Sequence, residues 1–153
     1  MADLFPVFDV PADIEGEDTE MEGYEGEYAP APLWDFAAGD FVMDGAHRSV
    51  YGSGYDAWVL WCTKTIMTQR WAHLAYSSSH GVEAEEAFAK ADREAVESAF
   101  EASITEALLA DPLERTVDVR DFEFSWEADS LTISCVAVGT DGNTADIEAT
   151  LEA

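Results

Sequence analysis

Basic residues are scarce in this chain of 153 residues, which has 33 acidic residues against 7 basic ones and a net charge of −26. Contacts to phosphate groups need clustered Lys and Arg side chains. The composition therefore predicts that neither nucleic acid nor a membrane is a binding partner.

The acid excess has three explanations: imitation of DNA, an acidic arm that seeks a basic partner, or adaptation to a salt-rich cytoplasm. In such a cytoplasm, screening makes a high net charge tolerable. Acidic residues are plentiful both in residues 1–32, which contain no base, and in residues 33–153. An excess that extends over both parts favours adaptation to a saline host.

Cysteines and long apolar runs are also lacking. Cys62 and Cys135 are too few and too far apart for a disulfide framework or a CxxC site, so we expect two buried, reduced thiols. No apolar run approaches the roughly 20 residues that span a bilayer, and the first residues lack the basic segment of a signal peptide. These absences predict a chain synthesised in soluble form inside the cell.

Motifs for chemistry are missing as well, although the stretch TQRWAHLAYSSSHG (residues 68–81) contains two histidines and three consecutive serines. There is no GxSxG nucleophile turn, and serine runs of this kind are usual turn and cap material. The histidines lack metal-ligand spacing, and no calcium-loop, Walker or dinucleotide-binding pattern occurs. We therefore predict that the protein is not an enzyme and has no cofactor and no metal-binding residue.

Residues 1–32 are predicted to form an extended acidic arm. It begins with LFPVFDVP, in which prolines fix φ and favour an extended chain. A Gly-, Pro- and Glu-rich segment follows that has almost nothing to bury. Because exposed aromatics are costly on a free tail, we expect a tether that docks onto a neighbouring subunit. The docking residues would be Leu4, Phe5, Val7 and Phe8. A solubilising tail is the alternative.

Residues 33–153 are predicted to fold as a single domain that begins with small β-hairpins around Ala38-Gly39 and Asp44-Gly45. Gly52-Ser53-Gly54 then opens a helix with an apolar stripe at helical spacing. That stripe comprises Tyr55, Trp58, Val59, Cys62 and Ile66. We expect Arg70 in the last turn of this helix, where a cation suits the helix dipole.

The stretch WAHLAYS alternates, with Ala72, Leu74 and Tyr76 on one side, which predicts a short strand or extended link. A second helical region is expected from about Glu83 to Ala110, with a break that Asp92 caps. The remainder predicts a three-strand antiparallel meander, in which a phase shift between Val119 and Phe122 indicates either a bulge or a strand partly covered on both faces. The expected fold class is α+β: two main helices packed on a small antiparallel sheet with this C-terminal meander, preceded by the extended arm.

The last strand alternates between apolar and polar residues, with Ala145, Ile147, Ala149 and Leu151 on one face. A strand at the end of a chain is often an edge strand, which offers unpaired backbone amides to another chain. An arm, a compact body and an edge strand are together the parts of an assembly subunit.

Five pieces occur in a familiar order between Pro32 and Glu152. They are WDFAAGDFV, a helix followed by Thr68-Gln69-Arg70, AYSSSHG, ITEALLADPLERTVDVRDFEF and LTISCVAVGTDGNTADIEATLE. This series resembles a family of contractile-tail baseplate proteins, the sheath-initiator wedge proteins sometimes labelled lysozyme-like, with their prophage relatives. The chain departs from the family pattern at His80, where an aromatic residue is usual, and in its longer acidic arm.

The resemblance implies a structural subunit of a contractile tail baseplate, in a virus or a related injection machine. Such a subunit joins wedge subunits around the tube and templates the first sheath ring by β-strand addition. The implied partners are other wedge proteins, tail tube and hub proteins and the sheath protein, with several copies in a six-fold arrangement. The implied location is the virion tail, assembled in the cytoplasm of a salt-adapted host.

The resemblance also implies that residues 68–81 form a joint, in which Arg70 makes a bidentate contact to a neighbouring carboxylate or backbone carbonyl. Together with the arm and the last strand, it predicts the subunit-interface residues: Leu4, Phe5, Phe8, Thr68, Arg70, Tyr76, Gly81, Ile147, Ala149 and Leu151. Two other functions stay open at this point, an acidic DNA-mimic inhibitor and a small regulatory adaptor on the same fold.

Overall fold

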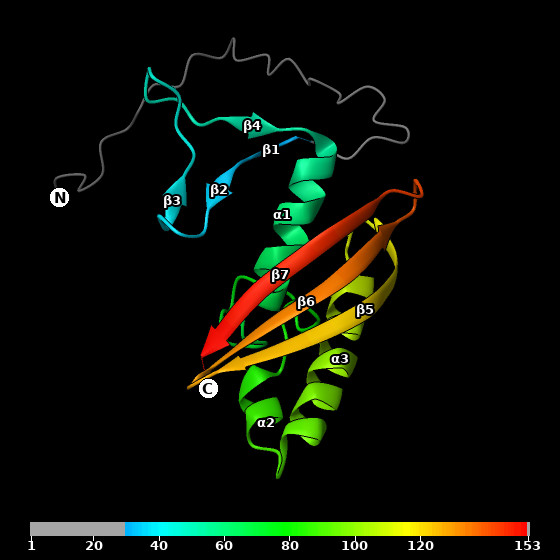
Figure 1. The fold of residues 1–153 in the computed structure, drawn as a ribbon. Helices are drawn as coiled ribbons and strands as arrows, with labels where there is room; N and C mark the ends of the chain where they lie inside the picture. The colour runs from blue at the N-terminus through cyan, green and yellow to red at the C-terminus, as the bar shows by residue number, and fades with distance from the viewer. Residues whose placement is uncertain (1–29, 153) are drawn as a thin grey trace, which may run out of the picture.

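A three-stranded antiparallel sheet organises the computed structural model, which describes residues 30–152. Its strands are β5 (Thr116–Glu127), β6 (Ser130–Gly139) and β7 (Thr144–Glu152), in the order β5-β6-β7 (Figure 1). Sequence-adjacent strands are neighbours in the sheet, so it is the predicted C-terminal meander. Both β5 and β7 are edge strands, because no strand of the described residues pairs with their outer sides.

Strict alternation in the sequence explains which face of the sheet is buried. In β6, every second residue is buried, and β7 repeats the pattern. The buried residues on these two strands are Leu131, Ile133, Cys135, Ala137, Ala145, Ile147 and Ala149. Side chains of a strand point alternately to the two faces, so one face supplies the core and the other faces solvent.

The helices of the described residues cover only the buried face of the sheet. Helix α1 (Gly54–Ile66) packs against β7 and helix α3 (Arg93–Leu109) against β5, while the short α2 (Ala84–Phe88) packs on α3 (Figure 1). The predicted break in the second helical region is confirmed, since Asp92 caps α3 by accepting a hydrogen bond from the Ala95 amide at 2.9 Å. The expected α+β fold class is therefore confirmed.

Helix α1 begins where the sequence predicted. Ser53 and Asp56 form a capping box, in which each side chain accepts a hydrogen bond from the other residue's amide. Of the predicted stripe, Trp58, Cys62 and Ile66 are fully buried. Tyr55 is partly exposed and donates its hydroxyl to the Thr144 carbonyl oxygen at 2.9 Å, which ties α1 to the start of β7.

Two predictions about the residues that follow this helix were wrong. Helix α1 ends at Ile66, so Arg70 lies beyond its last turn. Residues 71–77 form successive turns instead of a strand: backbone hydrogen bonds join Ala72 to Gln69 and Tyr76 to His73, and Trp71 has φ of 63°. The alternation here does not reflect a buried face, because Leu74 is fully exposed.

The predicted N-terminal hairpins are confirmed. Strand β1 (Ala31–Pro32) pairs with β4 (Tyr51–Gly52), and β2 (Trp34–Asp35) pairs with β3 (Asp40–Phe41). An isolated bridge joins Met43 to Ser49 around the second predicted turn. These small elements lie beside the N-terminal half of α1, away from α3 (Figure 1).

A buried ion pair fastens the end of α3 to the sheet. Asp111 accepts two hydrogen bonds from the Arg115 guanidinium, at 2.7 Å from Nε and 3.1 Å from Nη2, and both residues are buried. The guanidinium lies over the Trp61 ring at 5.3 Å, and the Arg115 carbonyl accepts a hydrogen bond from the Thr140 amide. The pair thus connects α1, α3 and the β6–β7 turn.

The two cysteines and the bulge in β5 lie as the sequence predicted. Both cysteines are free and buried, and burial raises the pKa of Cys62 to about 12 and that of Cys135 to about 11. The predicted bulge is present as a register shift between Arg120 and Glu123, with Asp121 at φ of 56°.

No helix of residues 30–152 has the length and apolarity that a membrane span requires.

We predict that Asp111→Ala lowers the free energy of unfolding by about 3–5 kcal/mol, because it leaves the Arg115 charge buried without its carboxylate. Asp44→Ala is the matched control, since Asp44 pairs with an Arg48 side chain that is 80% exposed. Its effect should stay within about 1 kcal/mol. Urea unfolding of the two variants measures both values, and equal losses would contradict this role of the buried pair.

Candidate subunit interface

The segment from Thr68 to Val82 is a loop whose two ends are joined. Gln69 and Val82 form an isolated parallel bridge, with hydrogen bonds from the Arg70 amide to the Val82 carbonyl and from the Val82 amide to the Thr68 carbonyl, at 2.8 and 2.9 Å. Gly81 has φ of 92°, and a Cβ there would lie 2.5 Å from the Thr68 carbonyl oxygen. Only glycine fits this closure.

Arg70 holds the closed loop to the helices. Its guanidinium donates from Nε to the Gly81 carbonyl and from Nη1 to the carboxylates of Glu83 and Glu106, each at 3.0 Å. Arg70 is 5% exposed, although the Glu106 side chain is largely in solvent. The carbonyl and carboxylate contacts expected of Arg70 thus occur within its own chain, and a contact with a neighbouring subunit stays a prediction.

Aromatic side chains pack the inner side of the loop. The Tyr76 ring lies 4.5 Å from the His80 ring and 5.1 Å from the Lys64 ammonium group. Burial lowers the pKa of His80, and the nearby Lys64 charge lowers it further. His80 therefore packs as an aromatic ring in the position where the resemblance expects an aromatic residue.

The outer side of the loop carries exposed apolar side chains. Trp71 is 65% exposed and Leu74 fully exposed, while the predicted interface residue Tyr76 is partly covered. The Thr68 hydroxyl is already bonded within its own chain, because it donates to the Lys64 carbonyl at 2.7 Å. The loop is therefore a fixed projection with an apolar tip, in which Thr68, Arg70 and Gly81 set the shape.

The predicted interface residues of the last strand lie on the inner face of the sheet. Ile147 and Ala149 are buried in the core, and Leu151 packs against it. Their side chains are therefore covered by the chain's own helices. What β7 leaves open is its outer face and its backbone edge beyond Thr144, whose carbonyl oxygen accepts a hydrogen bond from Tyr55.

The geometry of the β6–β7 turn decides which backbone groups point outward. The Gly139 amide donates to the Asn143 carbonyl at 2.8 Å, so this pair is a hydrogen-bonded one. Antiparallel pairs alternate between hydrogen-bonded and non-hydrogen-bonded, and Val138 pairs with Thr144 next. The residues of β7 that point N–H and C=O away from β6 are thus Thr144, Asp146, Glu148, Thr150 and Glu152.

The two edges of the sheet differ in regularity. Strand β7 pairs with β6 in an unbroken register from Thr144 to Glu152. Strand β5 has two register shifts, at Thr116/Asp118 and Arg120/Glu123. A bulge bends a strand and disturbs its row of amides, which protects an edge from pairing. The regular, receptive edge is therefore β7.

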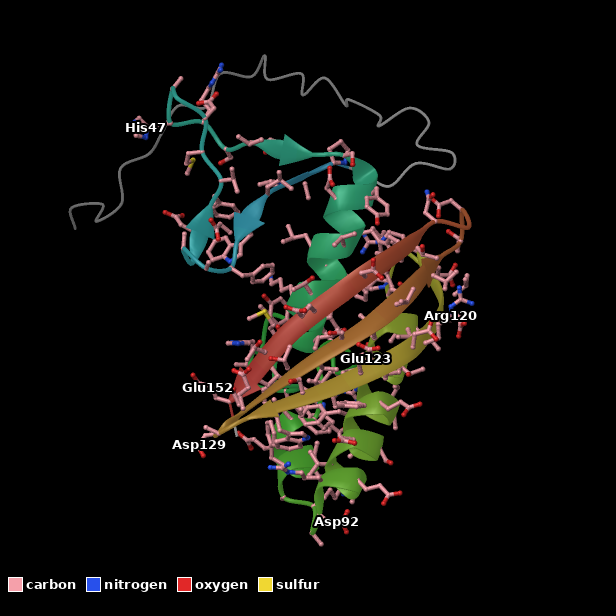
Figure 2. The ribbon with its side chains drawn as sticks, viewed as in Figure 1. His47, Asp92, Arg120, Glu123, Asp129 and Glu152 are labelled. Atoms are coloured by element: carbon pink, nitrogen blue, oxygen red, sulfur yellow. The ribbon has the colours of Figure 1, made fainter. Side chains whose placement is uncertain are left out.

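The outer face of the sheet is acidic toward its far end. Glu152 pairs in register with Ser130, next to Asp129 in the β5–β6 turn, and Figure 2 places Asp129 and Glu152 close together there. Glu148 and Asp146 continue the acidic row along β7, and both are exposed. A strand that joins this edge would therefore meet carboxylates on its outer side.

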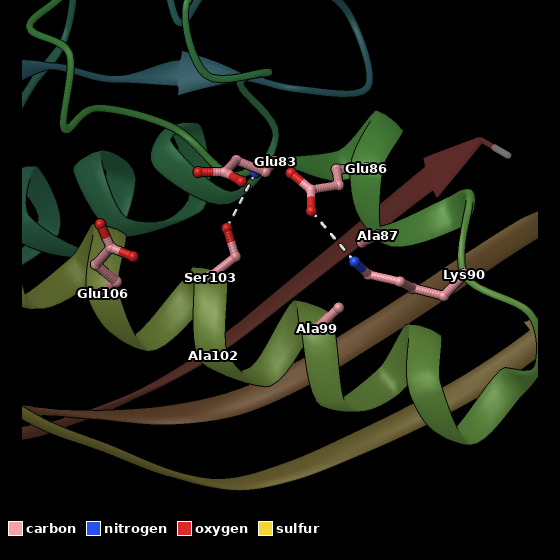
Figure 3. A pocket seen from close by; sticks show the side chains of 8 residues that line it. All are labelled: Glu83, Glu86, Ala87, Lys90, Ala99, Ala102, Ser103 and Glu106. Atoms are coloured by element: carbon pink, nitrogen blue, oxygen red, sulfur yellow. Dashed lines mark hydrogen bonds and ion pairs between the residues drawn. The ribbon is translucent and has the colours of Figure 1, made fainter.

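A hollow of about 180 Å³ lies between α2 and α3 (Figure 3). The Ser103 hydroxyl in it accepts a hydrogen bond from the Glu83 amide at 3.0 Å, and Lys90 lies 3.2 Å from the Glu86 carboxylate. The first contact holds the start of α2 against α3, and the second stays within the α2 segment, so these polar groups already have partners. Among residues 30–152, no three His, Cys, Asp or Glu side chains gather as metal ligands would.

Leu4, Phe5 and Phe8 lie outside the described residues, as does the rest of the arm before Pro30, so their docking stays a prediction.

A comparison with protein families gives the family of the chain. Residues 31–142, well over half of the sequence, match the family described as the contractile injection system sheath initiator. The chain belongs to this sheath initiator family. A search of curated proteins gave no match.

Membership in the sheath initiator family makes this chain a structural component of a contractile injection system, where it interacts with other tail components. The match begins at β1 and ends in the β6–β7 turn, so it includes both hairpins, all three helices of the described residues and the loop closed by Arg70. The resemblance inferred from the sequence is confirmed at the level of the family.

Sequence reasoning missed the outward-pointing residues of β7, because it used the apolar alternation and so selected Ile147 and Ala149. A signal for the outward-pointing residues was present in the turn sequence TDGN. Gly142, at φ of 82°, allows the three-residue turn after Gly139 that fixes the phase of the ladder.

We predict that Arg70→Ala lowers the free energy of unfolding by about 2–3 kcal/mol, below the usual loss for a buried pair because Glu106 can return to water. Arg70→Lys should lose less, since it keeps the charge but lacks the planar fork that places Nε on the Gly81 carbonyl and Nη1 on the two carboxylates. Arg48→Ala, which removes an exposed arginine, is the control. Thermal and urea unfolding measure the order Arg70→Ala, Arg70→Lys, Arg48→Ala. A loss for Arg70→Ala no larger than the control's would contradict the bridging role.

Proposed function

We propose that this sheath initiator joins the wedge subunits of a contractile tail baseplate around the tube and templates the first sheath ring by accepting a strand at the β7 edge. The observation that carries the proposal is the unbroken β7 edge, whose outward N–H and C=O groups have no strand partner among the described residues. The proposed partner at this edge is the sheath protein.

Strand addition suits this edge for an energetic reason. Each main-chain hydrogen bond contributes roughly 0.5–1.5 kcal/mol net, and outward residues recur at every second position of β7. The inner face of β7 is already packed against α1, so the template is rigid before the partner strand arrives. A rigid template reduces the ordering cost that binding must overcome.

The acidic outer row affects specificity more than affinity. Asp146 and Glu148 are exposed next to the edge, so a partner strand with basic side chains on its outer face would be favoured. A strand of acidic character would be repelled, including the β7 strand of a second copy of this chain. Repulsion between identical edges discourages pairing of two initiators and leaves the edge for a different protein.

The loop between Arg70 and Gly81 is the proposed contact to the other wedge subunits. Its exposed Trp71 and Leu74 give an apolar tip of fixed shape. In addition, Nη2 of Arg70 is buried without a hydrogen-bond partner among the described residues. Since this atom is buried, an acceptor from a wedge neighbour would have to enter the closed loop to reach it. We further propose that several copies of the chain act in a six-fold arrangement around the tube and hub proteins, in the baseplate of the tail.

The test is a proline in the β7 edge. Glu148→Pro removes an outward amide and should leave the ladder to β6 intact, because position 148 points away from β6. Glu148→Ala removes the same carboxylate but keeps the amide. We expect both variants to fold, and only Glu148→Pro to lose the ability to start sheath assembly. Electron microscopy counts the tubes that carry sheath when baseplates are assembled with each variant.

Comparison with the alanine variant separates the backbone from the side chain. Sheath assembly by Glu148→Pro at the level of Glu148→Ala would overturn strand addition at this edge. Loss of assembly in both variants would also overturn it, because the side chain rather than the amide would then be required.

A further inference from the structure

An apolar groove lies between the N-terminal hairpins and α1, on the side of α1 away from α3. It has a volume of about 410 Å³, within the rough range of 300–1,000 Å³ found for sites that bind small ligands. Its lining is predominantly aromatic and aliphatic, with one cation. The lining residues are Pro32, Trp34, Phe36, Phe41, Leu60 and Lys64.

The aromatic side chains of the groove are incompletely covered. Phe36 is 39% exposed and Phe41 is 44% exposed, although the Trp34 ring packs edge-on against Phe41 at 4.9 Å. The hairpins that carry them are held by strands of two residues each. On a chain of net charge −26, a concave aromatic surface of this kind indicates a binding site.

The chemistry of the groove fits one segment of this chain, Leu4–Phe8. The segment LFPVF is apolar and contains Pro6, which favours an extended conformation. Grooves lined by aromatic side chains are a recurrent site for extended, proline-containing segments. Asp3 and Asp9 flank the segment, and Lys64 supplies a positive charge at the groove.

The connection between segment and groove is short enough for both to belong to one chain. Pro32 lines the groove, and about 24 residues of chain separate it from Phe8. A flexible chain of that length has a root-mean-square span of roughly 27 Å. An attached segment is then present at an effective concentration on the millimolar scale. In the unassembled protein, the chain's own segment therefore competes well against free partners.

We propose that the groove formed by Trp34, Phe36, Phe41 and Leu60 is the binding site for the Leu4–Phe8 segment of the same chain. The acidic residues between the two form the connecting linker. This assignment is independent of strand addition at β7, since groove and edge share no residue. It also differs from the sequence expectation that the arm docks onto a neighbouring subunit.

The experiment is paramagnetic relaxation enhancement in the full chain. A nitroxide is attached to Ala2→Cys, and the native cysteines do not interfere, because both are buried with raised thiol pKa values. In a ¹⁵N-labelled sample, the amide signals of Trp34, Phe41 and Leu60 should lose most of their intensity relative to the reduced nitroxide. Amides on the outer face of the sheet, such as Thr132, should not.

Two variants test the specificity of the contact. Phe5→Ser combined with Phe8→Ser should abolish the intensity loss at the groove. The control Ile14→Ser, which removes an apolar residue of the arm outside the segment, should preserve it. Unchanged intensity loss in the double variant, or none in the unmodified sequence, would overturn the proposal.

The copy that supplies the segment is identified by mixing chains. Spin-labelled ¹⁴N chain is combined with unlabelled ¹⁵N chain, so that only contacts between copies broaden a signal. Binding within one chain predicts full intensity in this mixture. Intensity loss at the groove in this mixture would overturn the proposal in favour of a neighbour's groove.

Discussion

The structure depends on the one-sided covering of a three-stranded sheet. Helices α1 and α3 bury one face through Trp58, Ile66, Phe100 and Ile104, which are fully buried. The other face of the sheet is polar and acidic. Because the inner side chains of β7 are committed to this core, the strand can offer a partner only its backbone edge and its outer face. A second layer on the outer face would cover that face, and closure into a barrel would remove the edge.

The few basic residues contact carboxylates or aromatic rings of the same chain. Arg70 and Arg115 are buried in ion pairs, Arg48, Arg120 and Lys90 lie near carboxylates, and Arg93 and Lys64 lie over aromatic rings. Membership in the sheath initiator family disfavours the alternative of a DNA-mimic inhibitor. Adaptation to a saline host stays a prediction, because only the amount and distribution of charge in the sequence support it.

Local patterns in the sequence predicted most of the fold. The Ser53 cap, the stripe of Trp58, Cys62 and Ile66, the break at Asp92 and the alternation of β6 each depend on residues close together in the chain. The failures depend on distant contacts. Arg70 is fixed by Glu83 and Glu106, 13 and 36 residues away, and this closure turns the apparent strand after it into a loop. Residue spacing could not reveal those partners.

We propose that the outward amides of β7 form the template on which the first sheath ring assembles. Amide hydrogen exchange, resolved by residue in the free protein and again after the sheath protein is added, tests it most directly. We expect the amides of Asp146, Glu148 and Thr150 to exchange rapidly in the free protein and to become protected in the complex. Those of Ile147 and Ala149 should be protected throughout. Binding of sheath protein that leaves the three outward amides exchanging as before would contradict strand addition at the β7 edge.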